Sequence, residues 1–126
     1  MTPVRFTPEE LRYLRDQPLG RLATVDAQHA PQVVPVGFFV DEQTGDVSIG
    51  GIALGSTRKF RNVEATGRAA LVIDDLASTD PWHVRGVEIR GPAEARRDVD
   101  PPRPGMSREL ITIHPERIRS WGLSEL

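Results

Sequence analysis

The stretch from Arg68 to Asp75 reads Arg-Ala-Ala-Leu-Val-Ile-Asp-Asp, an apolar run of strand length that ends in two acids. Because short apolar runs bounded by turn residues are typical of buried strands, we expect this stretch to be the most buried strand of the chain. Farther along, residues 84–95 alternate apolar and charged side chains, with Val87 and Ile89 alternating with Glu88 and Arg90. This period of two predicts a second strand with one face in water.

Shorter strands and turns surround these two segments. Strands are predicted at residues 20–25, 31–40 and 47–49, with turns at 26–29 and 41–45, a loop at 77–81 and a proline-rich extended connection at 98–105. The chain closes with the apolar segments 110–113 and 118–121. The strands do not alternate regularly with long helices, as a Rossmann fold would require. The pattern therefore predicts a mainly β fold with two short helices, in which about six short strands form an antiparallel barrel.

Two segments carry helix signals. Thr7-Pro8-Glu9-Glu10 combines a hydroxyl cap, a proline at the first helical position and a glutamate three residues after the cap, which together predict the start of a helix. A second helix is predicted from Ser56 to about Ala65, with Gly67 as its terminator.

Composition narrows the class of protein. With 126 residues, of which 38% are hydrophobic, the chain suits one domain over residues 1–126. The formal charge of -2 gives no reason to expect binding to nucleic acid or to a membrane surface. There is no cysteine, and no apolar run approaches the ~20 residues that cross a bilayer. We expect a cytoplasmic protein that acts on a small molecule.

The stretch Ser-Thr-Arg-Lys-Phe-Arg-Asn at residues 56–62 places hydroxyls and cations at the start of the second predicted helix. Free backbone N–H groups and the helix dipole already favour an anion at such a position. A solvated helix end would show the same composition. Because the stretch follows Gly50-Gly51 and an apolar strand, we favour a seat for a phosphorylated small molecule. Lys59 is the chain's single lysine.

Side chains suited to catalysis are sparse. The histidines at 29, 83 and 114 lack the spacing of a metal site, so no metal is predicted, and only His83 stays a candidate proton donor. The neighbours Asp74 and Asp75 point to opposite faces of a strand and cannot share a proton. No serine lies in a nucleophile elbow. We predict no catalytic side chain.

The aromatic residues offer flat surfaces. Trp82 and Trp121 lie near turn-rich segments, where tryptophan belongs either to the core or to an interface that can stack on a ring. Phe38 and Phe39 cannot both face inward on a regular strand. One of these two rings is therefore expected to cover a neighbouring subunit or a ligand.

Six segments, taken in order, resemble the pyridoxamine 5′-phosphate oxidase-like flavin and deazaflavin reductases. They are residues 20–25, 30–37, 57–63, 70–75, 85–91 and 118–123, among which residues 57–63 read Thr-Arg-Lys-Phe-Arg-Asn-Val. The resemblance extends from about Phe6 to Leu123. It is strongest toward the actinobacterial branch that uses coenzyme F420, which includes dehydrotetracycline-reductase-like proteins.

The resemblance implies a six-stranded split β-barrel that forms a homodimer, with a cofactor site in each groove between the subunits. The residues it implies for cofactor binding are Ser56, Thr57, Arg58 and Lys59 for the phosphate, Val34, Pro35, Val36, Gly50 and Gly51 for the planar ring, and Trp82 and Arg85 of the other chain to close the groove. It also implies that reduced F420 donates a hydride to an electron-poor double bond. FMN as the cofactor, or a non-catalytic carrier of flavin, F420 or haem, are the alternatives.

Overall fold

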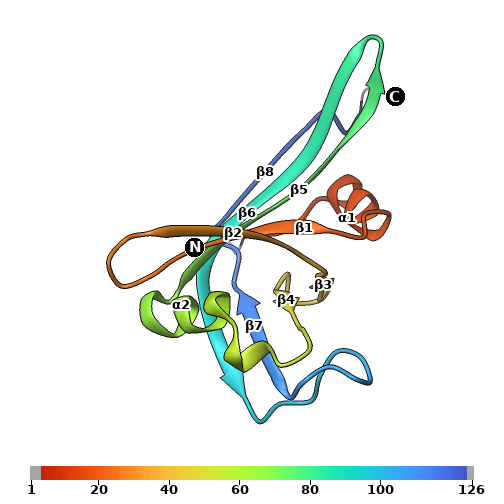
Figure 1. The fold of residues 1–126 in the computed structure, drawn as a ribbon. Coiled ribbons are helices and arrows are strands. Elements are labelled where there is room, and N and C mark those ends of the chain that lie inside the picture. The colour runs from red at the N-terminus through yellow and green to blue at the C-terminus, as the bar shows by residue number, and fades with distance from the viewer. Residues whose placement is uncertain (1–3, 125–126) are drawn as a thin grey trace.

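The computed structural model describes residues 4–124 (Figure 1). The elements are α1 (Pro8–Arg15), β1 (Gly20–Val25), β2 (Pro31–Val36), β3 (Phe39–Val40), β4 (Val47–Ile49), the 3₁₀ turn η1 (Leu54–Ser56), α2 (Arg58–Thr66), β5 (Arg68–Thr79), β6 (Trp82–Arg97), β7 (Glu109–Ile113) and β8 (Arg117–Trp121). The predicted fold class, mainly β with two short helices and antiparallel strands, is confirmed. The sheet has eight strands, however, whereas six were expected.

The long strand β6 organises the sheet. It pairs with β5 along one edge, and along the other edge with β7 near one end and β8 near the other. All the pairings are antiparallel, and the strand order is β2-β1-β5-β6-β7-β4-β3. The two strands at the ends of this order, β2 and β3, are consecutive in the chain.

This connection forces the sheet to curl. Only Gly37 and Phe38 separate β2 from β3, so Val36 and Phe39 can lie at most ~11 Å apart. Since the two strands form the opposite edges of the sheet, those edges must approach each other at this point. The sheet therefore closes into a barrel that is split between β2 and β3.

The core fills the inside of the curled sheet. Its fully buried side chains include Leu22, Leu71, Ile73, Val87, Ile89, Ile111 and Ile113. The helix α2 contributes Phe60 and Val63 to the core, and α1 contributes Tyr13 and Leu14. No helix in residues 4–124 is long and apolar enough to cross a membrane.

Three expectations about individual strands were wrong. β5 alternates between buried and more exposed side chains, and it is β7 that buries three consecutive residues, 111–113. The predicted loop at 77–81 belongs largely to β5, because the β5–β6 ladder continues to the pair Thr79–Trp82. The run 31–40 is two strands, because its halves pair with different partners on opposite edges of the sheet.

Candidate functional site

The second helix begins two residues later than predicted. Thr57 has an extended backbone and caps α2, since its Oγ1 accepts a hydrogen bond from the N–H of Phe60. The preceding turn η1 contains Ser56, whose hydroxyl donates to the carbonyl of Ala53, and the hydroxyl of Thr57 donates to that of Leu54. Both hydroxyls therefore help to fold the turn that presents α2.

The first turn of α2 presents an unblocked N-terminus with two adjacent cations. Within residues 4–124, no acceptor contacts the N–H groups of Arg58 and Lys59, and no carboxylate lies within 4.0 Å of their side chains. Arg61 differs from them, because its Nη1 donates to the carbonyl of Ser56 at 2.7 Å. Free N–H groups and cations at one helix end are what a phosphate requires, so this end fits the phosphate of a cofactor.

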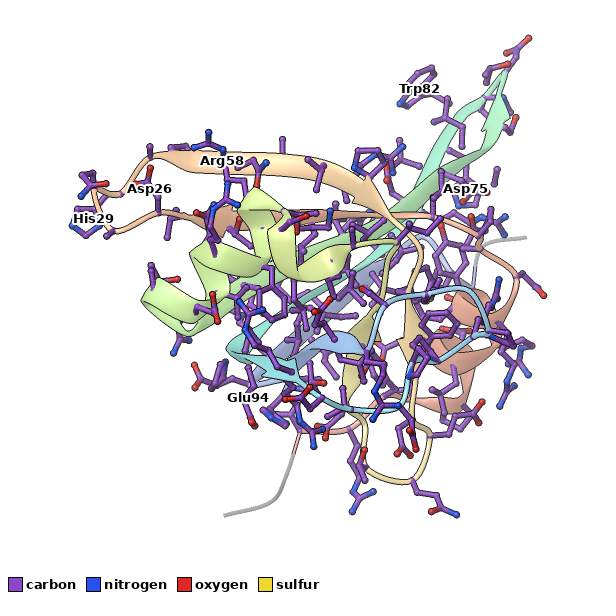
Figure 2. The ribbon with its side chains drawn as sticks, turned by 60° about the horizontal axis from the view of Figure 1, so that its bottom comes forward. Asp26, His29, Arg58, Asp75, Trp82 and Glu94 are labelled. Carbon is purple, nitrogen blue, oxygen red and sulfur yellow. The ribbon has the colours of Figure 1, made fainter. Side chains whose placement is uncertain are left out.

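Arg58 also lies beside the β1–β2 hairpin. Backbone N–H groups of Ala30 and Gln28 hold the pKa of the Asp26 carboxyl below its ordinary value, and the charge of Arg58 adds to the effect. Figure 2 shows Arg58 next to this hairpin. A hydrogen bond at 3.0 Å from the Asn62 side chain to Thr24 fixes α2 against β1. The N-terminus of α2 is thus held close to strands β1 and β2.

The segment Val34–Val36 forms the end of β2, an edge strand. Val34 is half-buried, Pro35 is exposed and Val36 is buried. In residues 4–124, β2 pairs only with β1, so its other edge has no ladder partner. An edge strand with free backbone groups can line a planar ligand.

The glycine pair that follows β4 lies under the connection 98–106. A side chain at Gly50 would come within 2.9 Å of Met106 Sδ and 3.0 Å of Pro102. The carbonyl of Gly51 accepts hydrogen bonds from the N–H and the hydroxyl of Ser107, at 2.9 and 3.1 Å. The space that the missing side chain leaves at Gly50 is thus filled by other residues of the same chain.

Trp82 and Arg85 lie elsewhere in the molecule. Trp82 is 69% exposed at the tip of the β5–β6 hairpin, far from Arg58 (Figure 2). Arg85 makes a two-pronged ion pair with Asp75, at 2.8 and 2.9 Å, and Asp75 also accepts a hydrogen bond from Tyr13 at 2.7 Å. Within one chain, Trp82 thus lies far from the N-terminus of α2, and Arg85 is held by Asp75.

The other polar candidates make structural contacts. His83 Nε2 lies 2.9 Å from the carbonyl of Gly122. Asp74 pairs with Arg21 on β1, whereas Asp75 pairs with Arg85, so the two carboxylates do point apart. The described residues contain no group of three or more histidines and acids that could hold a metal ion.

No local sequence pattern indicates the cavity that lies at the split of the barrel. This split cavity has a volume of about 520 Å³ and is lined by the C-terminal half of α1 and the residues that follow it, residues 37–40, Glu42, Arg103 and Met106. One of its lining residues, Gly37, directly follows the Val34–Val36 segment in the sequence. Its wall brings together parts of the chain that are far apart in sequence, so no local motif announces it.

Comparison with known proteins gives the family. Over residues 6–122, the sequence matches the family described as pyridoxamine 5′-phosphate oxidase. The chain belongs to this family. The resemblance inferred from the sequence segments is thereby confirmed.

Two relatives and one solved structure are similar over almost the whole chain. The chain is 47% identical to 5a,11a-dehydrotetracycline/5a,11a-dehydrooxytetracycline reductase of Streptomyces rimosus, covering 94% of this chain and 84% of the relative. It is 28% identical to F420H(2)-dependent biliverdin reductase of Mycobacterium tuberculosis, covering 93% and 89%. The crystal structure of HupZ from Group A Streptococcus superposes with a TM-score of 0.72 at 23% identity, covering 93% of this chain and 94% of that one. This last likeness shows the fold alone.

Proposed function

We propose that this protein is an F420-dependent reductase that transfers a hydride to an electron-poor double bond of a small organic substrate. The observation that carries the proposal is the pair Arg58 and Lys59 at the unblocked N-terminus of α2, in a chain 47% identical to a reductase. A second relative is an F420H(2)-dependent reductase. Both names support an oxidoreductase, and the second name supports a deazaflavin as its cofactor.

The chain's own residues would bind and orient. Arg58 and Lys59, with their free N–H groups, would hold the cofactor phosphate, and the turn made by Ser56 and Thr57 would present them. The backbone of Val34–Val36 would line the ring, and the Gly50-Gly51 pair would border it together with Pro102 and Met106, which pack against Gly50. Reduced F420, when bound there, would supply the hydride, and the proton would come from solvent. Positioning is then the protein's main contribution, and no nucleophile is needed.

The proposal includes a homodimer in the cytoplasm. The phosphate seat and Trp82 lie far apart within one chain, yet a second copy could bring its own Trp82 and Arg85 to the open edge of β2. A site completed in this way would suit so short a chain, which has little length for a separate domain to enclose a cofactor.

Titration with F420 and FMN in parallel tests the cofactor. We expect Lys59→Ala to weaken F420 by ~1.5–3 kcal/mol, the range for a lost charge-assisted hydrogen bond, or about tenfold to 150-fold in Kd. Arg96→Ala is the matched control, because Arg96 is an exposed arginine without a carboxylate partner in residues 4–124 and lies outside the site. An unchanged Kd for Lys59→Ala would remove Lys59 from the site.

Turnover separates a reductase from a carrier. Reduced F420 is mixed with the protein, with and without an enone acceptor, and its reoxidation is followed by absorbance. Acceptor-dependent reoxidation supports the proposal, whereas binding without turnover would favour a carrier. A protein that is yellow as purified and prefers FMN would instead indicate an FMN-dependent enzyme.

A further inference from the structure

The split cavity is lined by residues that directly follow the proposed ring site in the sequence. Gly37 lines the cavity and is the residue after Val36. The segment Val34–Val36 is the one proposed to line the cofactor ring. The cavity volume of about 520 Å³ falls within the range of about 300–1,000 Å³ that is typical of pockets for drug-sized ligands. The cavity is therefore large enough for an organic molecule of several rings.

The two phenylalanines at the split have different environments. Phe38 packs against the hydrophobic core. Phe39 does not, and the guanidinium of Arg103 lies 5.1 Å from the centre of its ring. Both rings line the cavity, and Phe39 lies there together with Arg103.

Of the cations that line the cavity, Arg103 is the one available to bind a ligand. Arg15 is held by two hydrogen bonds to Glu42, so those two charges compensate each other. Within residues 4–124, no carboxylate lies within 4.0 Å of Arg103, and no cation lies that close to Asp16, which also lines the wall. Stacking on Phe39 positions the guanidinium without neutralising it, so its N–H donors remain able to bind an anion.

The segment that carries Arg103 is fixed to the proposed ring site. Pro102 and Met106 pack against Gly50, and Ser107 binds the carbonyl of Gly51 while its Oγ accepts from the N–H of Leu54 at 2.9 Å. The connection 98–106 is thus a wall shared by the ring site and the split cavity.

We propose that the split cavity binds the hydride acceptor, and that Arg103 selects acceptors that carry an ionised oxygen on a flat conjugated ring system. Arg103 would bind the oxygen through charge-assisted hydrogen bonds, and the aromatic wall would contact the ring. The identification of the bound molecule as the acceptor rests on the proposed function, whereas the preference for a flat anion rests on the cavity alone.

Two quinones of similar shape test the selection. 2-Hydroxy-1,4-naphthoquinone is an anion at neutral pH, and 2-methyl-1,4-naphthoquinone is neutral. Their Kd values are measured by equilibrium dialysis, with and without saturating F420, for the wild type and for Arg103→Gln, Arg103→Lys and Arg108→Gln. Arg108 is the control because it also lies between β6 and β7 but pairs with Asp100 outside the cavity.

We expect Arg103→Gln to weaken the anionic quinone by about tenfold and the neutral one by less than about twofold. Arg103→Lys should recover part of the loss, since it keeps the charge but not the planar fork, and Arg108→Gln should bind both quinones like the wild type. Equal losses for the two quinones, or a wild type that binds neither, would overturn the inference.

F420 titration of the same variants keeps the two proposals apart. Arg103→Gln is expected to bind F420 like the wild type, because Arg103 is not part of the phosphate seat. A wild type that does not bind F420 would overturn the proposed function, and dialysis without F420 would still decide whether the cavity prefers the flat anion.

Discussion

His114 lies between two carboxylates, just after β7 ends. Its Nδ1 is 3.0 Å from Asp46 Oδ1 and its Nε2 is 2.6 Å from Glu94 Oε1. Since both ring nitrogens face acceptors, the charged imidazolium is favoured, and hydrogen bonds to Asp46 and then Glu94 raise the pKa of His114 above its ordinary value. The histidine side chain is 41% exposed, so solvent screens these interactions in part.

The sign of the pH effect follows from this shift. A raised pKa in the folded state means that the stabilisation is complete below the ordinary value of about 6.5 and is lost as the pH rises through the raised value. We expect His114 to contribute up to about 1 kcal/mol to the free energy of unfolding at about pH 6, and much less at about pH 9. Urea unfolding of the wild type and of His114→Gln at both pH values measures this, and parallel pH profiles would contradict it.

Residue-level interactions were predictable where they are local. The cap of α1 forms as Thr7 and Glu10 indicate, with the Thr7 N–H donating to Glu10 Oε1 at 2.8 Å and the Glu10 N–H donating to Thr7 Oγ1 at 3.1 Å. The contact between Arg103 and Phe39 was not predictable. It joins two segments that are distant in the sequence, and nothing around Arg103 in the sequence marks it.

At the scale of elements, α2 shows how one residue sets a boundary. Gly67 has φ 70 and ψ 20, and its N–H donates to the carbonyl of Val63 at 2.8 Å. A side chain added at Gly67 would meet no atom closer than the carbonyl of Ala93, at 4.0 Å. Substitution there would therefore act through backbone conformation and not through a clash.

We expect Gly67→Ala to lower the free energy of unfolding by about 1 kcal/mol, the typical cost of a left-handed backbone for alanine. Gly67→Asn should lose less, because asparagine tolerates this conformation. Urea denaturation of the three proteins gives the comparison. Equal stability of the wild type and Gly67→Ala would show that the position does not need a left-handed residue.

The limits of strand prediction also have a physical cause. Gly20–Val25 and Val47–Ile49 were predicted with the bounds that the structure has, because turns flank both segments. The run 31–40 was predicted as one strand, since its apolar residues continue past Gly37. Only the pairing of its two halves with β1 and β4 shows the break, and pairing between distant strands is not a local property.

At the scale of the whole molecule, the β5–β6 hairpin extends beyond the barrel (Figure 1). It exposes Leu76, Val84 and Trp82 by 43, 38 and 69%, and Leu76 and Val84 are cross-strand partners. Apolar side chains gathered on a projecting hairpin favour an interface. The barrel could be predicted from the order of strands and turns, but which residues of a second copy complete a site depends on how two copies pack, which the pattern of one chain does not specify.

Complementation between two variants tests whether the cofactor site is shared. We expect Lys59→Ala and Trp82→Ala each to lower turnover when present in both subunits. In a heterodimer of the two, one site loses both side chains, but the other has Lys59 from one subunit and Trp82 from its partner. Random pairing makes about half of the dimers mixed, so about a quarter of all sites regain both native residues.

Co-refolding equal amounts of the two variants should therefore restore turnover to about a quarter of the wild-type value, above that of either variant alone. The matched control is the double variant Lys59→Ala/Trp82→Ala refolded with itself, which can form no native site. Analytical ultracentrifugation of the same samples reports whether the dimers form. Only a site divided between two subunits can be repaired by pairing the two variants. Dimers that recover no activity would therefore place the complete site within one chain, and so would a protein that sediments as a monomer.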